Sequence, residues 1–126
     1  MDRLLLVVAG GAAGTGCRYL LSSYVYAHLD KPTFPWANLL VNVSGSFAIG
    51  VLAQLFDARL LVSPTARAAL LTGVLGGYTT FSSFAYETFA LLRNGEHVLA
   101  LLNAGGNLVL GLVAVWAGIR MAQVVW

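Results

Sequence analysis

Charged residues are scarce in this sequence. Seven Lys or Arg and five Asp or Glu make up 10% of the 126 residues, whereas 59% are hydrophobic. A typical soluble domain is about 25% charged, so the composition excludes a soluble domain and indicates a membrane protein. The basic residues are scattered singly along the chain, which excludes a nucleic-acid-binding surface.

Cysteine and recognisable catalytic groups are also nearly missing. The single cysteine, Cys17, cannot form an intrachain disulfide, and its position among small residues predicts a packed, inert thiol. The sequence has no Ser-His-Asp set at plausible depth, no paired carboxylates and no phosphate-binding loop followed by Lys, and its two His lack metal-site spacing. We therefore expect that the protein is not an enzyme.

What the sequence does have is four long apolar segments, at about residues 4–27, 36–56, 68–92 and 98–121. A helix needs about 20 apolar residues to cross a bilayer core. Charges and breakers fall in the short connections, where Ser63 and Pro64 predict the cap and first residue of the third helix. We expect one all-α, four-span membrane domain over residues 1–126, with antiparallel neighbouring helices.

The third segment is interrupted by the run from Gly76 to Phe84, GGYTTFSSF. Inside a bilayer, non-helical backbone is tolerated only where protein or a water-filled cavity surrounds it, and freed carbonyls can then bind ions. Phe81 and Phe84 share a helix face, with Ser83 on an adjoining flank. Because ring edges carry positive potential, they could attract a small anion without holding it tightly. This run predicts a helix break and the first candidate site.

Polar residues form rows within two other segments. Asn38, Asn42 and Ser46 are spaced by four in the second segment, and Asn103 and Asn107 are spaced by four in the last. Hydrogen bonds between membrane helices, worth roughly 1 kcal/mol each, would explain these rows. A pore lining would explain them equally well, and the residues alone leave both interpretations open.

Two charged residues lie inside the apolar segments. Arg18 could reach a membrane interface with its long side chain or form part of a cationic vestibule. Glu87 is a functional candidate, since a carboxylate at the bilayer centre costs about 3 kcal/mol. Its depth is open, because the side chain could also reach the interface.

The basic residues show little bias between the two ends of the helices, with four at the end of the termini and three at the other. A weak bias of this kind predicts insertion in both orientations, which would let two copies pair antiparallel. The basic residues at the end of the termini are Arg3, Arg59, Arg67 and Arg120, and those at the other end are Arg18, Lys31 and Arg93.

Two pairs of small residues, Gly10 with Gly14 and Ser46 with Gly50, predict that helices approach each other closely. For the first pair we expect the contact to lie within the chain.

Three motifs carry a family resemblance over nearly the whole chain. They are Gly10 to Gly14 leading to Arg18-Tyr19, Asn38 to Asn42 followed by Gly45-Ser46-Phe47 and Gly50, and Gly73 to Phe84. With these motifs in this order, the chain resembles the Fluc family of small fluoride channels, also called CrcB-like proteins. The resemblance implies a four-span subunit of an antiparallel, dual-topology homodimer in the cell (inner) membrane, with two pores that export fluoride passively from the cytoplasm.

The resemblance also implies residue roles. Phe81 and Phe84 match the family's pore phenylalanines and Asn42 its pore asparagine, while Ser83 matches a hydroxyl beside the pore and Arg18 a basic residue near the vestibule. In a further match, the backbone carbonyls of Gly76 and Thr79, from both subunits, would hold a central structural sodium ion.

The last segment departs from the family pattern. Where the family often carries a Tyr and a Ser or Thr, this chain has Asn103 and Asn107 around two glycines. Amides can also donate hydrogen bonds, so both residues remain candidates for the pore.

A small multidrug-type, proton-coupled exporter is the main alternative. Such proteins also have four spans and often form antiparallel dimers. They need a membrane-embedded carboxylate, usually in the first span, and the first segment has none. Glu87 could take that role only if it were deeply buried. A non-transporting accessory subunit would explain the glycine packing, but neither the break nor the polar rows.

Overall fold

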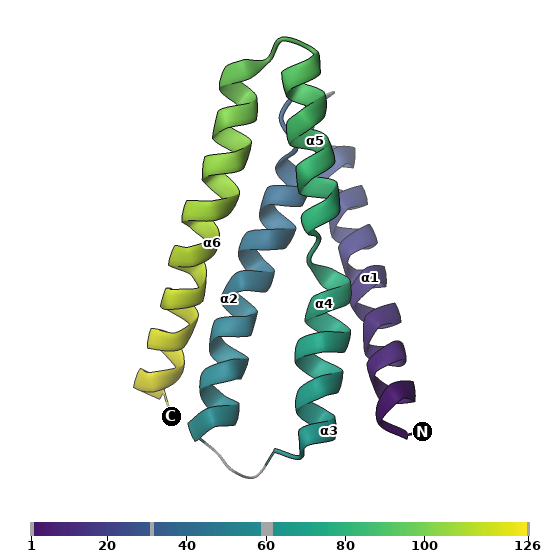
Figure 1. Cartoon of the computed structure of the whole chain (residues 1–126), viewed down its shortest axis with the longest axis vertical. Coiled ribbons are helices and arrows are strands. Elements are labelled where there is room, and N and C mark those ends of the chain that lie inside the picture. The colour runs from purple at the N-terminus through teal and green to yellow at the C-terminus, as the bar shows by residue number, and fades with distance from the viewer. Residues whose placement is uncertain (1, 31, 59–61, 126) are drawn as a thin grey trace.

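A computed structural model describes residues 2–30, 32–58 and 62–125, and within these ranges the chain is helical, without strands (Figure 1). The helices stand side by side in four columns, of which the third is made of four consecutive pieces. In order the elements are α1 (Asp2–His28), α2 (Trp36–Ala58), α3 (Pro64–Arg67), the π-helical segment η1 (Ala68–Leu75), α4 (Gly76–Tyr78), α5 (Phe81–Arg93) and α6 (His97–Val125).

Three of the columns, α1, α2 and α6, are long and apolar enough to cross a membrane by length and composition. The third column starts as the sequence predicts, since Ser63 Oγ accepts a hydrogen bond from the Ala66 N–H at 3.2 Å and Pro64 is the first helical residue. Its π-helical segment was not predicted. Such segments are rare and often occur at functional sites.

Both termini lie at the same end of the molecule (Figure 1). At this end Arg67 forms an ion pair with Asp57, with 2.7 Å between Nη1 and Oδ1. Arg93 ends α5 at the opposite end. Lys31 and Arg59 lie outside the described residues, so the predicted balance of basic residues stays a prediction.

Glycines bring α1 into backbone contact with the lower half of the third column, η1 and α4. A Cβ on Gly14 would overlap the carbonyl oxygen of Val74, and one on Gly77 would overlap that of Gly11. Gly10 likewise lies against Ala69 and Val74. The small pair in the first segment therefore packs within the chain, as predicted. Cys17, however, is exposed, so the prediction of a packed thiol is wrong.

Helices α2 and α6 pack through small residues as well. A Cβ on Gly50 would overlap the backbone of Val115, and one on Gly118 would overlap the backbone of Phe47. The buried positions of α6 are nearly all small, which allows this approach. They are Ala100, Asn103, Gly111, Ala114, Gly118 and Ala122.

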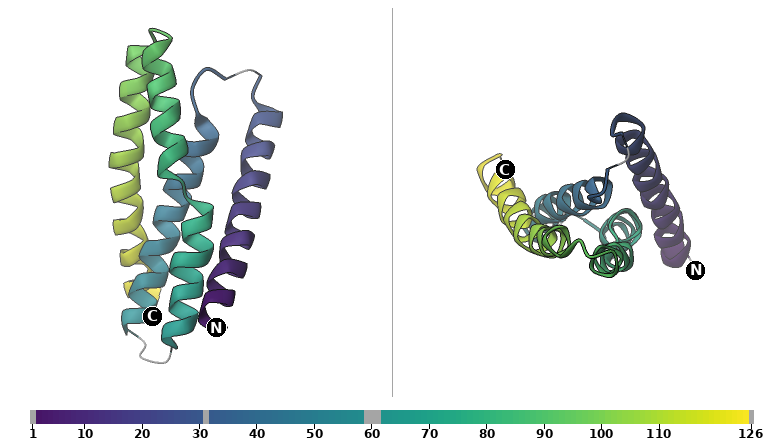
Figure 2. Two further views of the ribbon diagram at one scale, coloured as in Figure 1. Left: turned by 45° about the vertical axis from the view of Figure 1, so that its right-hand side comes forward. Right: turned by 90° about the horizontal axis from the view of Figure 1, so that it is seen from above.

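The third column changes its neighbour along its length. Below the break, η1 and α4 pack on α1, and above it α5 packs on α6. Figure 2 shows this change of neighbour: at the upper end α1 stands apart from α5, and α5 runs beside α6. The break, where the third column changes from packing on α1 to packing on α6, therefore lies in the middle of the molecule.

Candidate functional site

The predicted break occurs at two residues, Thr79 and Thr80. Helix α4 ends at Tyr78, both threonines have extended backbone, and α5 begins at Phe81. Thr80 caps the new helix, since its Oγ1 accepts a hydrogen bond from the Ser83 N–H at 3.3 Å. Capping of this kind satisfies one of the first free N–H groups of a helix.

Asn42 of α2 holds the break in place. Its Oδ1 accepts from the Thr80 N–H at 3.0 Å, and its Nδ2 donates to the Thr80 carbonyl at 3.3 Å. The Asn42 amide thus binds both the N–H and the carbonyl of Thr80, whose N–H has no acceptor within a helix. The amide from the second segment therefore stabilises the interruption in the third.

Four backbone carbonyls, those of residues 76–79, lose their usual helical partners at the break. In a continuous helix, Gly76 would accept from the Thr80 N–H and Thr79 from the Ser83 N–H. Those donors bind Asn42 Oδ1 and Thr80 Oγ1 instead. The carbonyl oxygens of Gly76 and Thr79 are thereby freed, whereas that of Gly77 accepts from Thr15 Oγ1 at 3.3 Å.

The polar rows of α2 and α6 meet at Asn42. Its Nδ2 lies 3.0 Å from Asn38 Oδ1 and 2.9 Å from Asn107 Oδ1, so the amide bridges the two helices. Asn38 in turn donates to Glu87 Oε2 at 2.7 Å. The rows therefore form hydrogen bonds between helices, which was one of the two interpretations open from sequence.

Both rows also border cavities, and the second interpretation, a pore lining, stays a prediction. A cavity of about 430 Å³ lies between α2, the η1–α4 half and α6, and another of about 360 Å³ lies between α1, α2 and α5. Thr80 lines both, which puts the break between them. The first is lined by Asn42, Ser46, Gly76, Thr79, Phe81 and Asn107, among others, and the second by Arg18, Tyr26, Asn38, Ser83 and Glu87, among others.

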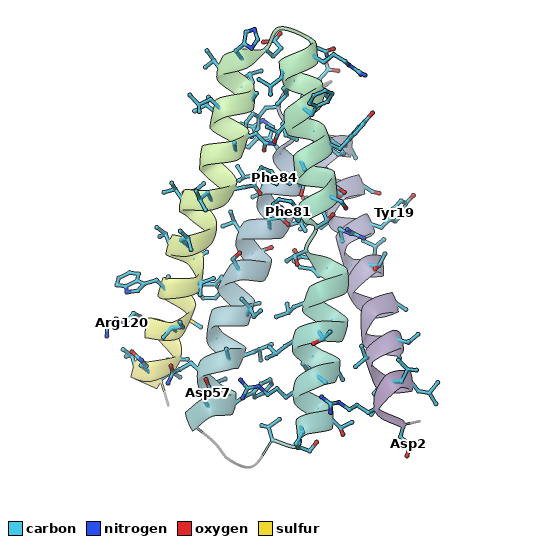
Figure 3. All side chains as sticks on the ribbon, viewed as in Figure 1. Asp2, Tyr19, Asp57, Phe81, Phe84 and Arg120 are labelled. Atoms are coloured by element: carbon cyan, nitrogen blue, oxygen red, sulfur yellow. The ribbon has the colours of Figure 1, made fainter. Side chains whose placement is uncertain are left out.

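Phe81 and Phe84 form a pair on the first turn of α5 (Figure 3). Their ring centroids are 5.5 Å apart, with 58° between the planes, a tilted arrangement that turns ring edges in different directions. Phe84 is half-buried, whereas Phe81 is 79% exposed and borders the first cavity.

The structure thus brings most of the sequence candidates to one region, but divides them between two cavities. Asn103 differs from the rest, because it has no exposed surface and lies behind Asn107. Sequence reasoning missed the capping role of Thr80 and the contacts of Thr88, whose Oγ1 accepts from Asn103 Nδ2 and donates to the Phe84 carbonyl, both at 2.8 Å. For Thr80 the signal was its position just before a helix start, where a threonine often caps, whereas Thr88 had no signal of its own.

Comparison with known proteins identifies the family. Residues 5–119 match the model of the family described as CrcB-like protein, Camphor Resistance (CrcB). The chain belongs to this CrcB-like family. The resemblance found in the sequence is therefore confirmed, and with its long apolar helices this CrcB-like chain is a multi-pass membrane protein.

Several curated relatives of this CrcB-like chain are similar over nearly their whole length. A protein of Opitutus terrae is 50% identical over 120 residues, covering 94% of this chain and 90% of the relative. One of Geobacter sulfurreducens is 46% identical and covers 98% of both, and one of Thermus thermophilus is 49% identical and covers 96% and 95%. All three relatives are named fluoride-specific ion channel FluC.

Proposed function

We propose that this chain forms a fluoride-selective channel that lowers cytoplasmic fluoride by passive export across the inner membrane. The curated relatives carry the name of that activity. The observation that carries the proposal is the helix break held by Asn42 between two cavities lined with amides, hydroxyls and a phenyl ring. A channel makes and breaks no covalent bond, in agreement with the expectation that the protein is not an enzyme.

The chemistry of the cavities suits a small anion. Fluoride is strongly hydrated, so a selective path must replace its water with donors and still release it. Asn42 supplies an amide donor at the first cavity, which Asn107 also lines, and Ser83 supplies a hydroxyl in the second. Arg18 adds positive charge to the second cavity, and the edges of Phe81 and Phe84 add weak attraction.

The Asn42 amide is already fully engaged in this structure, because its two N–H groups face three acceptors. A fluoride ion at this point would replace one of these acceptors. Exchange of one partner for another keeps the energy of entry low, as conduction requires.

The active form in this proposal is an antiparallel homodimer of four-span subunits. The carbonyls of Gly76 and Thr79 are freed beside the first cavity, at a depth where lipid offers no donors. Gly76 is also exposed in the single chain. A second copy covering this face would shield these polar groups, and the weak charge bias of the sequence would allow it to insert upside down.

A structural sodium ion at the dimer centre fits the same two carbonyls. Sodium is a hard cation that prefers oxygen ligands, and carbonyls at a broken helix are suited to such an ion. When bound, the ion would supply positive charge that balances the carbonyl dipoles of Gly76 and Thr79. We expect the melting temperature of the purified dimer to rise with sodium concentration at constant ionic strength, and no rise would contradict this site.

Fluoride flux from liposomes tests the main proposal. Purified protein is reconstituted, a potassium diffusion potential is imposed, and external fluoride is followed with an ion-selective electrode. Release of fluoride without chloride supports the channel, and release no faster than from empty liposomes refutes it. Flux of a cationic drug driven by a pH gradient would instead support the exporter alternative.

A further inference from the structure

The hydrogen bonds that start at the helix break follow one direction through two other helices. The Thr80 N–H donates to Asn42 Oδ1 at 3.0 Å, and Asn42 Nδ2 donates to Asn107 Oδ1 at 2.9 Å. Asn107 Nδ2 then donates to Asn103 Oδ1 at 3.1 Å and to the Asn103 carbonyl at 3.0 Å. Each amide accepts from the previous group and donates to the next.

The same direction continues back to the third column. Asn103 Nδ2 donates to Thr88 Oγ1 at 2.8 Å, and Thr88 Oγ1 donates to the carbonyl of Phe84, also at 2.8 Å. The series therefore begins at the residue before Phe81 and ends on the carbonyl of Phe84. We call Asn42, Asn107, Asn103 and Thr88 the amide relay.

Backbone groups at both ends determine how each relay member is oriented. The N–H of Thr80 can only donate, and the carbonyl of Phe84 can only accept. Reversing any amide between them would place nitrogen against nitrogen or oxygen against oxygen. A buried polar group left without a partner costs about 1–3 kcal/mol, so the arrangement has one favoured orientation.

We infer that Thr88 and Asn103 are positioning residues that fix the orientation of the Asn107 amide, and through its oxygen the orientation of the Asn42 N–H groups at the first cavity. The inference rests on the proposed channel function and goes beyond it, because neither residue needs to touch fluoride. Asn103 has no exposed surface, and the Thr88 hydroxyl both accepts and donates inside the bundle.

The orientation of Asn107 matters because it borders the first cavity with Asn42. An Asn107 free to rotate would present its carbonyl oxygen to the cavity as readily as its N–H groups, and that oxygen repels an anion. The relay keeps this oxygen occupied by Asn42 and the amide hydrogens pointed at Asn103. Loss of the relay should therefore slow fluoride and weaken its preference over chloride.

A set of threonine variants tests the inference by flux. Thr88→Val keeps the shape of the side chain but removes both hydrogen bonds, and it should slow fluoride efflux about tenfold, while Thr88→Ser restores it. Thr65→Val, the same change in α3 far from the relay, should leave efflux unchanged. Asn103→Leu should match Thr88→Val, and the double variant should be no slower than the slower single one, since both act through one relay.

A second measurement does not need flux. With ¹⁵N-labelled asparagine in the whole dimer, the side-chain amide signals of Asn42 and Asn107 are assigned by Asn42→Ala and Asn107→Ala. Thr88→Val and Asn103→Leu should shift both sets of signals, and Thr65→Val should not. If the wild-type protein shows no fluoride flux, the channel proposal is refuted, but the amide signals still test the positioning role. Unmoved signals, or wild-type flux in both relay variants, would overturn the positioning role.

Discussion

The two halves of the third column are built on different principles. Below the break, η1 and α4 meet α1 through glycine backbones, with Gly14 against Val74 and Gly77 against Gly11. Above the break, α5 meets α6 through side chains, where Asn103 binds Thr88. Close glycine packing leaves little room for a ligand, whereas amides and hydroxyls on spaced helices can exchange partners. The side of the lower half that faces α1 is therefore suited to holding the bundle together, whereas the upper half and the Gly76 end of the lower half border the cavities.

The largest expected effect comes from removing Asn42, which holds the break between the two halves. Asn42→Leu leaves the Thr80 N–H, Asn38 and Asn107 without their partner, and should lower fluoride efflux about 100-fold, equivalent to about 3 kcal/mol. The liposome assay measures this effect. Gln54→Leu removes an amide from the same helix away from the break and should conduct normally. Equal flux in both variants would remove Asn42 from the path.

A smaller effect is expected at the aromatic pair of the upper half. Phe81→Ile and Phe84→Ile keep apolar volume but remove the ring edges, so fluoride efflux should slow at least about tenfold. The proposed dimer should remain intact by size-exclusion chromatography. Phe89→Ile changes an exposed ring on the same helix and serves as the control. Wild-type flux in the first two variants would exclude the rings from the mechanism.

In the lower half, an added methyl group should destabilise the protein. Gly14→Ala places a Cβ on the Val74 carbonyl, and we expect a cost of about 1–3 kcal/mol, seen as a lower melting temperature in detergent. Gly16→Ala on the same helix meets no atom within 4 Å and should melt like the wild type. If both variants melt alike, the glycine contact does not stabilise the lower half.

The smallest effect is expected at the ion pair between α2 and α3. Both Asp57 and Arg67 are largely exposed, so water and salt weaken their attraction. Asp57→Asn should change stability by less than about 1 kcal/mol, and fluoride efflux should not change. A clear drop in melting temperature would show that this end of the lower half depends on charge as well as on glycine.

Much of the fold could be predicted from the sequence because it depends on local properties. Long apolar runs set the helices, Ser63 and Pro64 start the third column, and the polar run from Gly76 to Phe84 contains the break. The π-helical segment 68–75 could not be predicted, because nothing in its local sequence distinguishes it from an α-helix, and its contact with α1 is not visible in the sequence.

The candidate site was predicted less completely. Spacing by four showed that Asn38 shares a helix face with Asn42, and Asn103 with Asn107, but not which partners these residues bind. Those partners lie on other helices, and periodicity within one helix carries no information about them. The same limit hid Thr88, whose proposed positioning role rests on its contacts with Asn103 and the Phe84 carbonyl.

The placement of both termini at one end limits how two copies could be joined into a single polypeptide. A soluble tether from the last residue of one copy to the first of the next starts and finishes on the same side of the membrane. Such a tandem would hold its two halves in the same orientation, whatever the length of the tether. A single-chain version of the proposed antiparallel assembly would need an odd number of additional membrane-crossing segments between the copies.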